Sequence, residues 1–206
     1  MTFPAYSREP RRSASGTAGD VVDITLRTRR GSLAGDPLTE RSRRVWSAGD
    51  YDRISAGFRD VFFLDAATGW VAGPSIYKTT DGGTNWTKQL GDGNTEFAAI
   101  SFADTQNGWA TGFNNLVLHT TDGGQSWIAQ NVGAPPVTAI TGVSAISSTT
   151  AWVAGWNGFV ARTSDSGQTW RKETIAGASD VDFEDALFLD ANTGWVGGNI
   201  GIWQRR

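Results

Sequence analysis

The chain has 206 residues, a formal net charge of −3 at pH 7 and a hydrophobic content of 39%. This length and content are enough to bury one sizeable core, and the weak net charge does not favour nucleic acid as the main partner. The absence of cysteine excludes disulfides, thiolate metal sites and cysteine nucleophiles. No apolar run approaches the roughly 18 residues of a membrane helix, and the first residues lack the apolar core of a signal peptide, so we expect no membrane insertion.

Residues 1–42 differ in composition from the rest of the chain. They contain Arg but no Lys, few large apolar residues and no sustained periodicity. A segment of this composition cannot bury enough apolar surface to order itself. We therefore predict a disordered N-terminal segment over 1–42 and a folded region over 43–206.

From Phe58 onward the sequence repeats itself. The phrases TGWVAG, NGWATG, TAWVAG and TGWVGG place Trp70, Trp109, Trp152 and Trp195 at spacings of 39, 43 and 43 residues. A period of about 40 residues is typical of a propeller blade or of a helix pair. The predicted units cover about 58–96, 97–139, 140–182 and 183–206.

The local chemistry of each unit favours strands over helices. The units open with DVFFLD, AISFAD, GVSAIS and DALFLD, and glycines follow at intervals of about 8 to 12 residues, which is strand and hairpin spacing. Each unit is therefore predicted to form four short antiparallel strands in a meander. The predicted fold class is all-β: a β-propeller of about four four-stranded antiparallel blades, either a closed small ring or an arc of a larger propeller.

A second phrase recurs as TTDGGTNW, TTDGGQSW and TSDSGQTW. It resembles the Asp box of BNR-repeat proteins, in which the Asp accepts backbone N–H bonds inside a turn, the Gly supplies a positive φ and the Trp packs between blades. Asn85 stands in the first copy where a Ser or Thr is expected. Because each Asp is committed to a turn, we predict a structural role for the box residues: Asp81, Gly83, Trp86, Asp122, Gly124, Trp127, Asp165, Gly167 and Trp170.

The fourth unit matches only the first three strands of the others. Two alternatives follow from this observation. Either the segment around Trp46 supplies the missing outer strand and closes the ring, or the chain is an arc that is part of a larger propeller or self-associates through its open blade edges.

In a meander, alternate loops emerge on opposite faces, so both Asp-containing turns of a blade share one face. The opposite face carries the loops that join the second and third strands. We predict that a partner binds there, through Phe113, Asn114, Trp156 and Asn157. The alternative is that the two aromatic rings cap the packing between blades.

Basic residues occupy one predicted column of the third strands, namely Lys78, His119, Arg162 and Arg205. They are candidates for a positive arc that meets an acidic partner. The alternative is that they pair with carboxylates of neighbouring blades or project into water. His119 is the only histidine and has no nucleophile or metal partner in the pattern. Together with the turn-bound box aspartates, this leads us to expect no catalytic residue, metal site or cofactor.

The phrases FLDAATGWVAG, IYKTTDGGTNW and FLDANTGWVGG are similar to the repeats of the photosystem II stability and assembly factor family. The resemblance implies a non-enzymatic scaffold in photosynthesis that binds a partner protein, such as a subunit of a membrane complex. It also implies a periplasmic, lumenal or secreted location. The alternative is a sialidase-like glycoside hydrolase or a carbohydrate-binding propeller module. A sialidase site needs a Tyr nucleophile, and Tyr77 is the only Tyr from Phe58 onward.

Overall fold

The computed structural model describes residues 57–135 and 138–205. These residues form four antiparallel sheets, which we call blades 1 to 4. The predicted disordered segment 1–42 and the candidate strand around Trp46 lie outside the described residues. The strands are β1 (Asp60–Phe63), β2 (Gly69–Ala72), β3 (Ile76–Thr79) and β4 (Thr87–Leu90) in blade 1; β5 (Phe97–Phe102), β6 (Gly108–Gly112), β7 (Val117–Thr120) and β8 (Ile128–Ala129) in blade 2; β9 (Ile140–Ala145), β10 (Ala151–Gly155), β11 (Val160–Thr163) and β12 (Arg171–Glu173) in blade 3; and β13 (Phe183–Phe188), β14 (Gly194–Gly198) and β15 (Gly201–Arg205) in blade 4.

Each blade is a meander in which consecutive strands pair. Blades 1 to 3 have four strands and blade 4 has three, and every element of the described ranges is a strand. The predicted all-β class with antiparallel propeller blades is therefore confirmed. Within the described part of the chain, no helix has the length and apolar character needed to cross a membrane.

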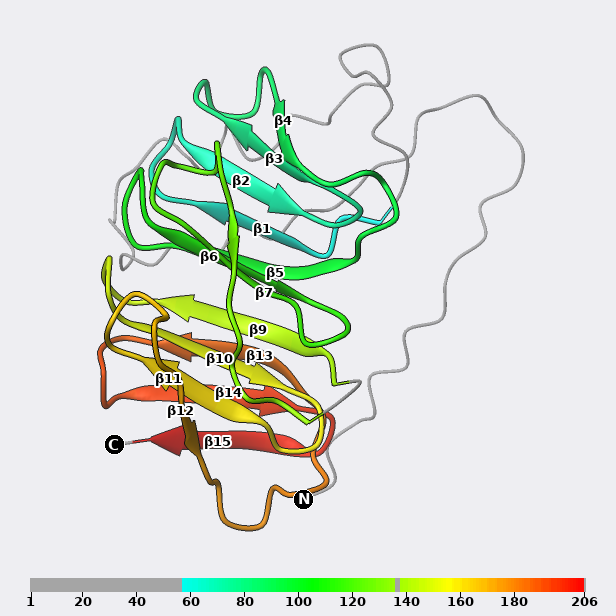
Figure 1. Cartoon of the computed structure of the whole chain (residues 1–206), viewed down its shortest axis with the longest axis vertical. Helices are drawn as coiled ribbons and strands as arrows, with labels where there is room; N and C mark the ends of the chain where they lie inside the picture. The colour runs from blue at the N-terminus through cyan, green and yellow to red at the C-terminus, as the bar shows by residue number, and fades with distance from the viewer. Residues whose placement is uncertain (1–56, 136–137, 206) are drawn as a thin grey trace, which may run out of the picture. The chain divides into compact units, whose positions relative to one another are not determined.

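The blades follow one another through their first strands. The strand β1 contacts β5, β5 contacts β9, and β9 contacts β13, while blades 1 and 4 lie at opposite ends of the row (Figure 1). Residues 57–135 and 138–205 therefore do not close a ring among themselves.

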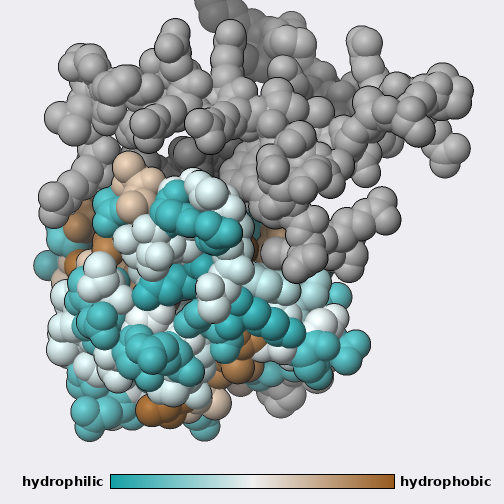
Figure 2. All heavy atoms as spheres, turned by 90° about the horizontal axis from the view of Figure 1, so that it is seen from above, coloured by the Kyte–Doolittle hydropathy of each residue, from teal (hydrophilic) through white to brown (hydrophobic). Residues whose placement is uncertain are grey.

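Stacked aromatic rings hold successive blades together. The ring of Trp70 in blade 1 lies 3.6 Å from that of Phe102 in blade 2, and Trp152 in blade 3 lies 4.1 Å from Phe188 in blade 4. All four side chains are at most 2% exposed. Burial of such large rings supplies most of the favourable energy of the interface. On the face seen in Figure 2, hydrophilic and near-neutral residues dominate and hydrophobic residues show only in small separate areas.

A one-residue shift in blade 4 corrects the predicted column of basic residues. Strand pairing sets Lys78, His119 and Arg162 opposite the unit tryptophans, but Trp195 lies opposite Gln204 rather than Arg205. The reason is a shorter turn, since Gly198 pairs with Gly201. A shift of one residue exchanges the two faces of a strand, which the ten-residue spacing that blade 4 shares with blades 2 and 3 could not reveal.

Candidate functional site

The Asp boxes form three nearly identical hydrogen-bonded turns. In blade 2, Asp122 Oδ1 accepts from Thr120 Oγ1 and from the Ser126 amide, both at 2.8 Å, and Asp122 Oδ2 accepts from Ser126 Oγ at 2.5 Å. The Gly124 amide donates to Thr120 Oγ1 at 2.9 Å. Blade 3 repeats these contacts with Asp165 and Thr169. The carboxylates are therefore held inside turns.

The first box uses Asn85 in place of the usual hydroxyl residue. Its side-chain amide donates to Asp81 Oδ2 at 2.7 Å, and its backbone amide donates to Asp81 Oδ1 at 2.8 Å. The carboxamide N–H thus replaces the hydroxyl O–H as the second donor. The departure from the motif leaves the turn intact.

These hydrogen bonds favour the ionised carboxylates. Donation from the side chain and the amide of Ser126 lowers the pKa of Asp122 to about 2, and the same contacts from Thr169 lower the pKa of Asp165 to about 2. A carboxyl group with so low a pKa is ionised at neutral pH and has no proton to donate, and its oxygens already accept hydrogen bonds from the turn. The geometry is that of a structural motif.

The turns between the first and second strands use the same chemistry. Asp65 Oδ1 accepts from the amides of Ala67 and Thr68, both at 2.7 Å. The two kinds of turn also contact each other, because the Gly82 amide of the box donates to the Ala67 carbonyl at 2.8 Å. Both kinds of turn therefore lie at the same end of the blade's strands, as expected for a meander.

The basic column points between the blades. Lys78 Nζ lies 4.9 Å from the Trp70 ring of its own blade and donates to the Gly123 carbonyl of blade 2 at 3.2 Å. Arg162 Cζ lies 5.7 Å from the Trp152 ring. These cation–π contacts hold the charged groups of Lys78 and Arg162 against tryptophan rings of their own blades.

Three arginines converge on Glu173, whose side chain is 18% exposed. The shortest contacts are 3.3 Å from Arg162 Nε, 3.8 Å from Arg171 Nε and 3.1 Å from Arg205 Nη1. A cavity of about 240 Å³ between blades 3 and 4 is lined in part by Glu173 and Arg205. The carboxylate thereby offsets much of the positive charge that we expected to face a partner.

His119 is buried against Trp109, with ring centroids 4.2 Å apart. Its side chain is 4% exposed, and its Nε2 and the Trp109 Nε1 have no hydrogen-bond partner among the described residues. Burial lowers the pKa of His119 below its usual 6.5, so the ring is neutral at physiological pH. This position is enclosed by the interface between blades 2 and 3.

The loops on the opposite face bring three blades into contact. Arg59 Cζ lies 4.9 Å from the Phe113 ring, and Phe113 meets Trp156 edge-on at 5.8 Å. Trp156 is 37% exposed, and Arg59 also pairs with the exposed Glu96 at 3.2 Å. We call Arg59, Phe113 and Trp156 the loop-face row. The sequence pattern identified the two aromatic residues but not Arg59, which lies before the first repeated strand.

The turns that display this row have left-handed backbone at asparagine. Asn114 has φ of 57° and Asn157 has φ of 57°, a conformation that Asn tolerates better than other side-chain-bearing residues. The Asn157 amide donates to Asp182 Oδ1 at 3.2 Å. The turns are therefore defined by their backbone conformation and by a hydrogen bond from Asn157 to the following loop.

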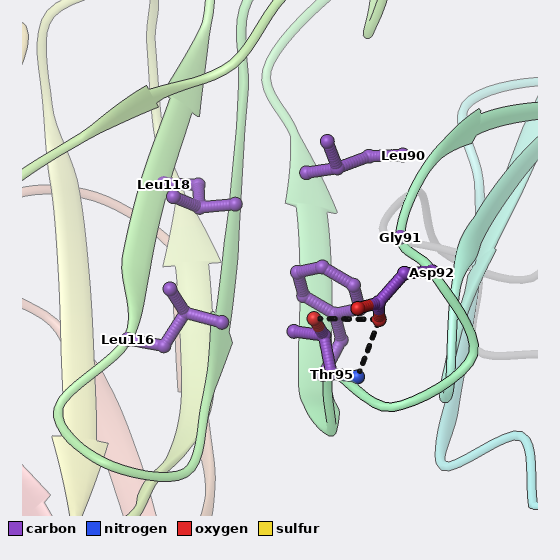
Figure 3. A pocket seen from close by; sticks show the side chains of 7 residues that line it. Leu90, Gly91, Asp92, Thr95, Leu116 and Leu118 are labelled. Atoms are coloured by element: carbon purple, nitrogen blue, oxygen red, sulfur yellow. Dashed lines mark hydrogen bonds between the residues drawn. The ribbon is translucent and has the colours of Figure 1, made fainter.

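A shallow apolar groove lies between blades 1 and 2. Figure 3 shows Leu90 facing Leu116 and Leu118 across this space of about 460 Å³. Asp92 Oδ1 at one rim accepts from the Thr95 amide at 3.1 Å. The sequence pattern did not single out this groove, because its leucines alternate as ordinary strand residues. No group of His, Cys, Asp or Glu side chains in the described ranges is suited to a metal ion.

Sheet order and repeated boxes together define the class: these are β-propeller blades of the Asp-box type. The family described as photosynthesis system II assembly factor YCF48 matches residues 38–135. The photosystem II assembly lipoprotein Ycf48 of Synechococcus sp. (strain CC9902) is 36% identical over 92 residues, which cover 42% of this chain and 27% of that relative. The predicted resemblance to the photosystem II assembly factor family is confirmed.

Solved structures agree with the fold. A structure described as YCF48 bound to D1 peptide matches with a TM-score of 0.54 at 22% identity, over 70% of this chain and 61% of that chain. A GH74 enzyme described as ancestral matches with a TM-score of 0.58 at 18% identity, over 73% of this chain and 23% of that chain. At these identities the likeness concerns the fold, which hosts both binding proteins and enzymes.

Proposed function

We propose that this chain is a non-enzymatic scaffold that binds a partner protein through the face opposite the Asp boxes. The observation that carries the proposal is the loop-face row, in which Arg59, Phe113 and Trp156 come from successive blades and touch. Exposed aromatic and arginine side chains are the residue types that dominate binding energy at protein interfaces. Asn114 and Asn157 flank the row and offer amide donors and acceptors.

The matched relatives support a protein partner. The family match and the curated relative are assembly factors of photosystem II, and one matched structure is described as bound to a D1 peptide. We infer that the partner of this chain is a segment of a membrane-complex subunit in photosynthesis. Lys78 and Arg205 contribute indirectly, because Lys78 ties blade 1 to the Gly123 carbonyl of blade 2 and Arg205 ties blade 4 to Glu173 of blade 3, where Arg162 also pairs.

A fluorescence-anisotropy titration with a labelled D1 peptide tests this proposal. Trp156→Ala is expected to weaken binding by about tenfold or more, because truncation of a central aromatic residue removes a large contact area. Ile128→Ala is the matched control, because Ile128 is 66% exposed and lies on β8, away from the row. Equal affinity of the two variants, or no binding by the unmodified chain, would contradict the proposal.

The carbohydrate alternative uses the same exposed ring. A sugar-binding module would stack a pyranose on Trp156, the exposed tryptophan of the loop-face row. A glycan array distinguishes the two functions. Glycan binding that is lost in Trp156→Ala, without any peptide binding, would favour the carbohydrate-binding module, and turnover of a glycoside substrate would favour the hydrolase.

A further inference from the structure

Two of the three contacts between successive described blades, those of blade 1 with blade 2 and of blade 3 with blade 4, follow one rule. Phe102 covers Gly108, where a Cβ would lie 2.5 Å from the Phe ring, and meets Trp127 edge-on at 6.0 Å. The free side of the Phe102 ring then receives Trp70 of the preceding blade. Phe188 covers Gly194 in the same way and receives Trp152. Each such contact therefore joins a Trp of one blade to a Phe of the next.

Blade 1 presents the Phe half of this contact. Phe63 covers Gly69, where a Cβ would lie 2.7 Å from the ring, and meets Trp86 edge-on at 6.1 Å. The preceding residue Phe62 packs toward Phe102 of blade 2, so strand alternation turns Phe63 to the other face. Phe63 is half-buried, and no described residue stacks on its ring.

Blade 4 presents the Trp half. Phe188 and Val196 face blade 3, so alternation turns Leu187 and Trp195 away from it. Within the described ranges, Trp195 is the unit tryptophan without a stacked ring. The surrounding surface is apolar: Leu187, Leu189, Ile200 and Ile202 are 45%, 60%, 73% and 76% exposed, and they make up four of the seven exposed large hydrophobic residues described. A patch of this kind marks an interaction surface.

We propose that blade 4 of one copy of this chain binds blade 1 of a second copy, with Trp195 stacked on Phe63. The proposed contact repeats the one that joins blade 1 to blade 2 and blade 3 to blade 4. A single chain therefore carries both halves of it. Because the two surfaces differ, the interface is head to tail. The blades form a closed ring if a dimer makes two such equivalent contacts. Two copies bring together eight of the blades that residues 57–135 and 138–205 form, and propellers use about four to eight blades.

Cross-linking tests the predicted pairing. The chain has no cysteine, so Phe63→Cys and Trp195→Cys introduce unique thiols. A short bismaleimide is expected to link a mixture of the two variants into a covalent dimer, and to link neither variant to itself. Self-linking of Trp195→Cys would show a back-to-back contact of blade 4 and overturn the proposal, as would the absence of a dimer in the mixture.

Sedimentation equilibrium tests the interface without modification. The unmodified chain is expected to show twice the monomer mass at micromolar concentration. Leu187→Asp is expected to weaken association by about tenfold or more, because it buries an unpaired carboxylate in an apolar contact. Ile128→Asp, also on an exposed position, is expected to associate normally. A monomeric unmodified chain, or equal association of both variants with native circular dichroism, would overturn the proposal.

Discussion

The indole ring of Trp70 lies parallel to the phenyl ring of Phe102, at a centroid distance of 3.6 Å and an interplanar angle of 10°. Three elements make this contact: the Trp at the start of β2, the Phe at the end of β5, and Gly108 beneath the Phe ring. The glycine before the unit tryptophan is thus needed for the approach of the ring. This relationship explains why the phrase TGW or NGW recurs.

Gly108→Ala is expected to destabilise the protein by about 1 to 3 kcal/mol, because the added Cβ would overpack against the Phe102 ring. That Cβ would lie 2.5 Å from the ring. Chemical denaturation with guanidinium measures the change. Gly197→Ala is the control, since a Cβ at Gly197 meets nothing within 4 Å. If both variants unfold at the same midpoint, the packing of the Phe102 ring does not require a glycine at position 108.

Asp122→Ala is expected to lower the melting temperature, because the Thr120 hydroxyl and the amide and hydroxyl of Ser126 lose their common acceptor. The pKa of Asp122 and that of Asp165 are lowered from 3.8 to about 2 in the folded protein. A lowered folded-state pKa contributes stability that is present above the unfolded pKa and is lost as the pH falls. Stability is therefore expected to fall between pH 3.8 and about 2. Thermal melts over this window should show a smaller loss in Asp122→Asn, and an unchanged slope would contradict the assignment.

His119 gives the protein a second, separate pH dependence. Its pKa in the folded protein is lower than the usual 6.5 because burial disfavours the charged ring. The unfolded chain therefore takes up the proton first, and stability is expected to decrease as the pH falls below about 6.5. Denaturation midpoints measured between pH 7.5 and about 5.5 report this slope. Because His119 is the only histidine, His119→Gln should remove the slope in that window, and its persistence would exclude His119 as the cause.

Glu173→Gln is expected to destabilise the protein by about 1 to 3 kcal/mol, because it removes the negative charge on which Arg162, Arg171 and Arg205 converge. The matched control is Glu96→Gln, whose partner Arg59 lies on the surface, with side-chain exposures of 46% for Arg59 and 57% for Glu96. That variant should stay within about 0.5 kcal/mol. Guanidinium unfolding of both variants makes the comparison. A larger effect at Glu96 than at Glu173 would contradict the role given to burial.

Much of the fold was predictable because the signals are local. Glycine spacing and Asp-box chemistry specify short strands and tight turns within a few residues of each other. The structure confirms the all-β blades, and the contacts of Asp81, Asp122 and Asp165 stay within their own turns. The effect of Asn85 was harder to foresee, because the motif specifies a hydroxyl whereas the turn needs only a second donor.

The candidate binding residues were only partly accessible to sequence reasoning. The alternation of loops in a meander placed Phe113 and Trp156 on one face, but their contact depends on how two blades pack. Arg59 joins them from a third blade and carries no repeat signal. Partner binding by these residues stays a prediction.

The sequence by itself determined the blade repeat, the box turns and the alternation of faces, since these depend on neighbouring residues. Only the tertiary structure decided where the basic column points, because Lys78 and Arg162 find their partners across strands and blades. It also decided the register of β15, where a shorter turn places Gln204 opposite Trp195 and turns Arg205 toward Glu173. The ten-residue spacing from Trp195 to Arg205, which equals that in blades 2 and 3, cannot report such a shift, because the face of a strand residue is set by pairing with its neighbour.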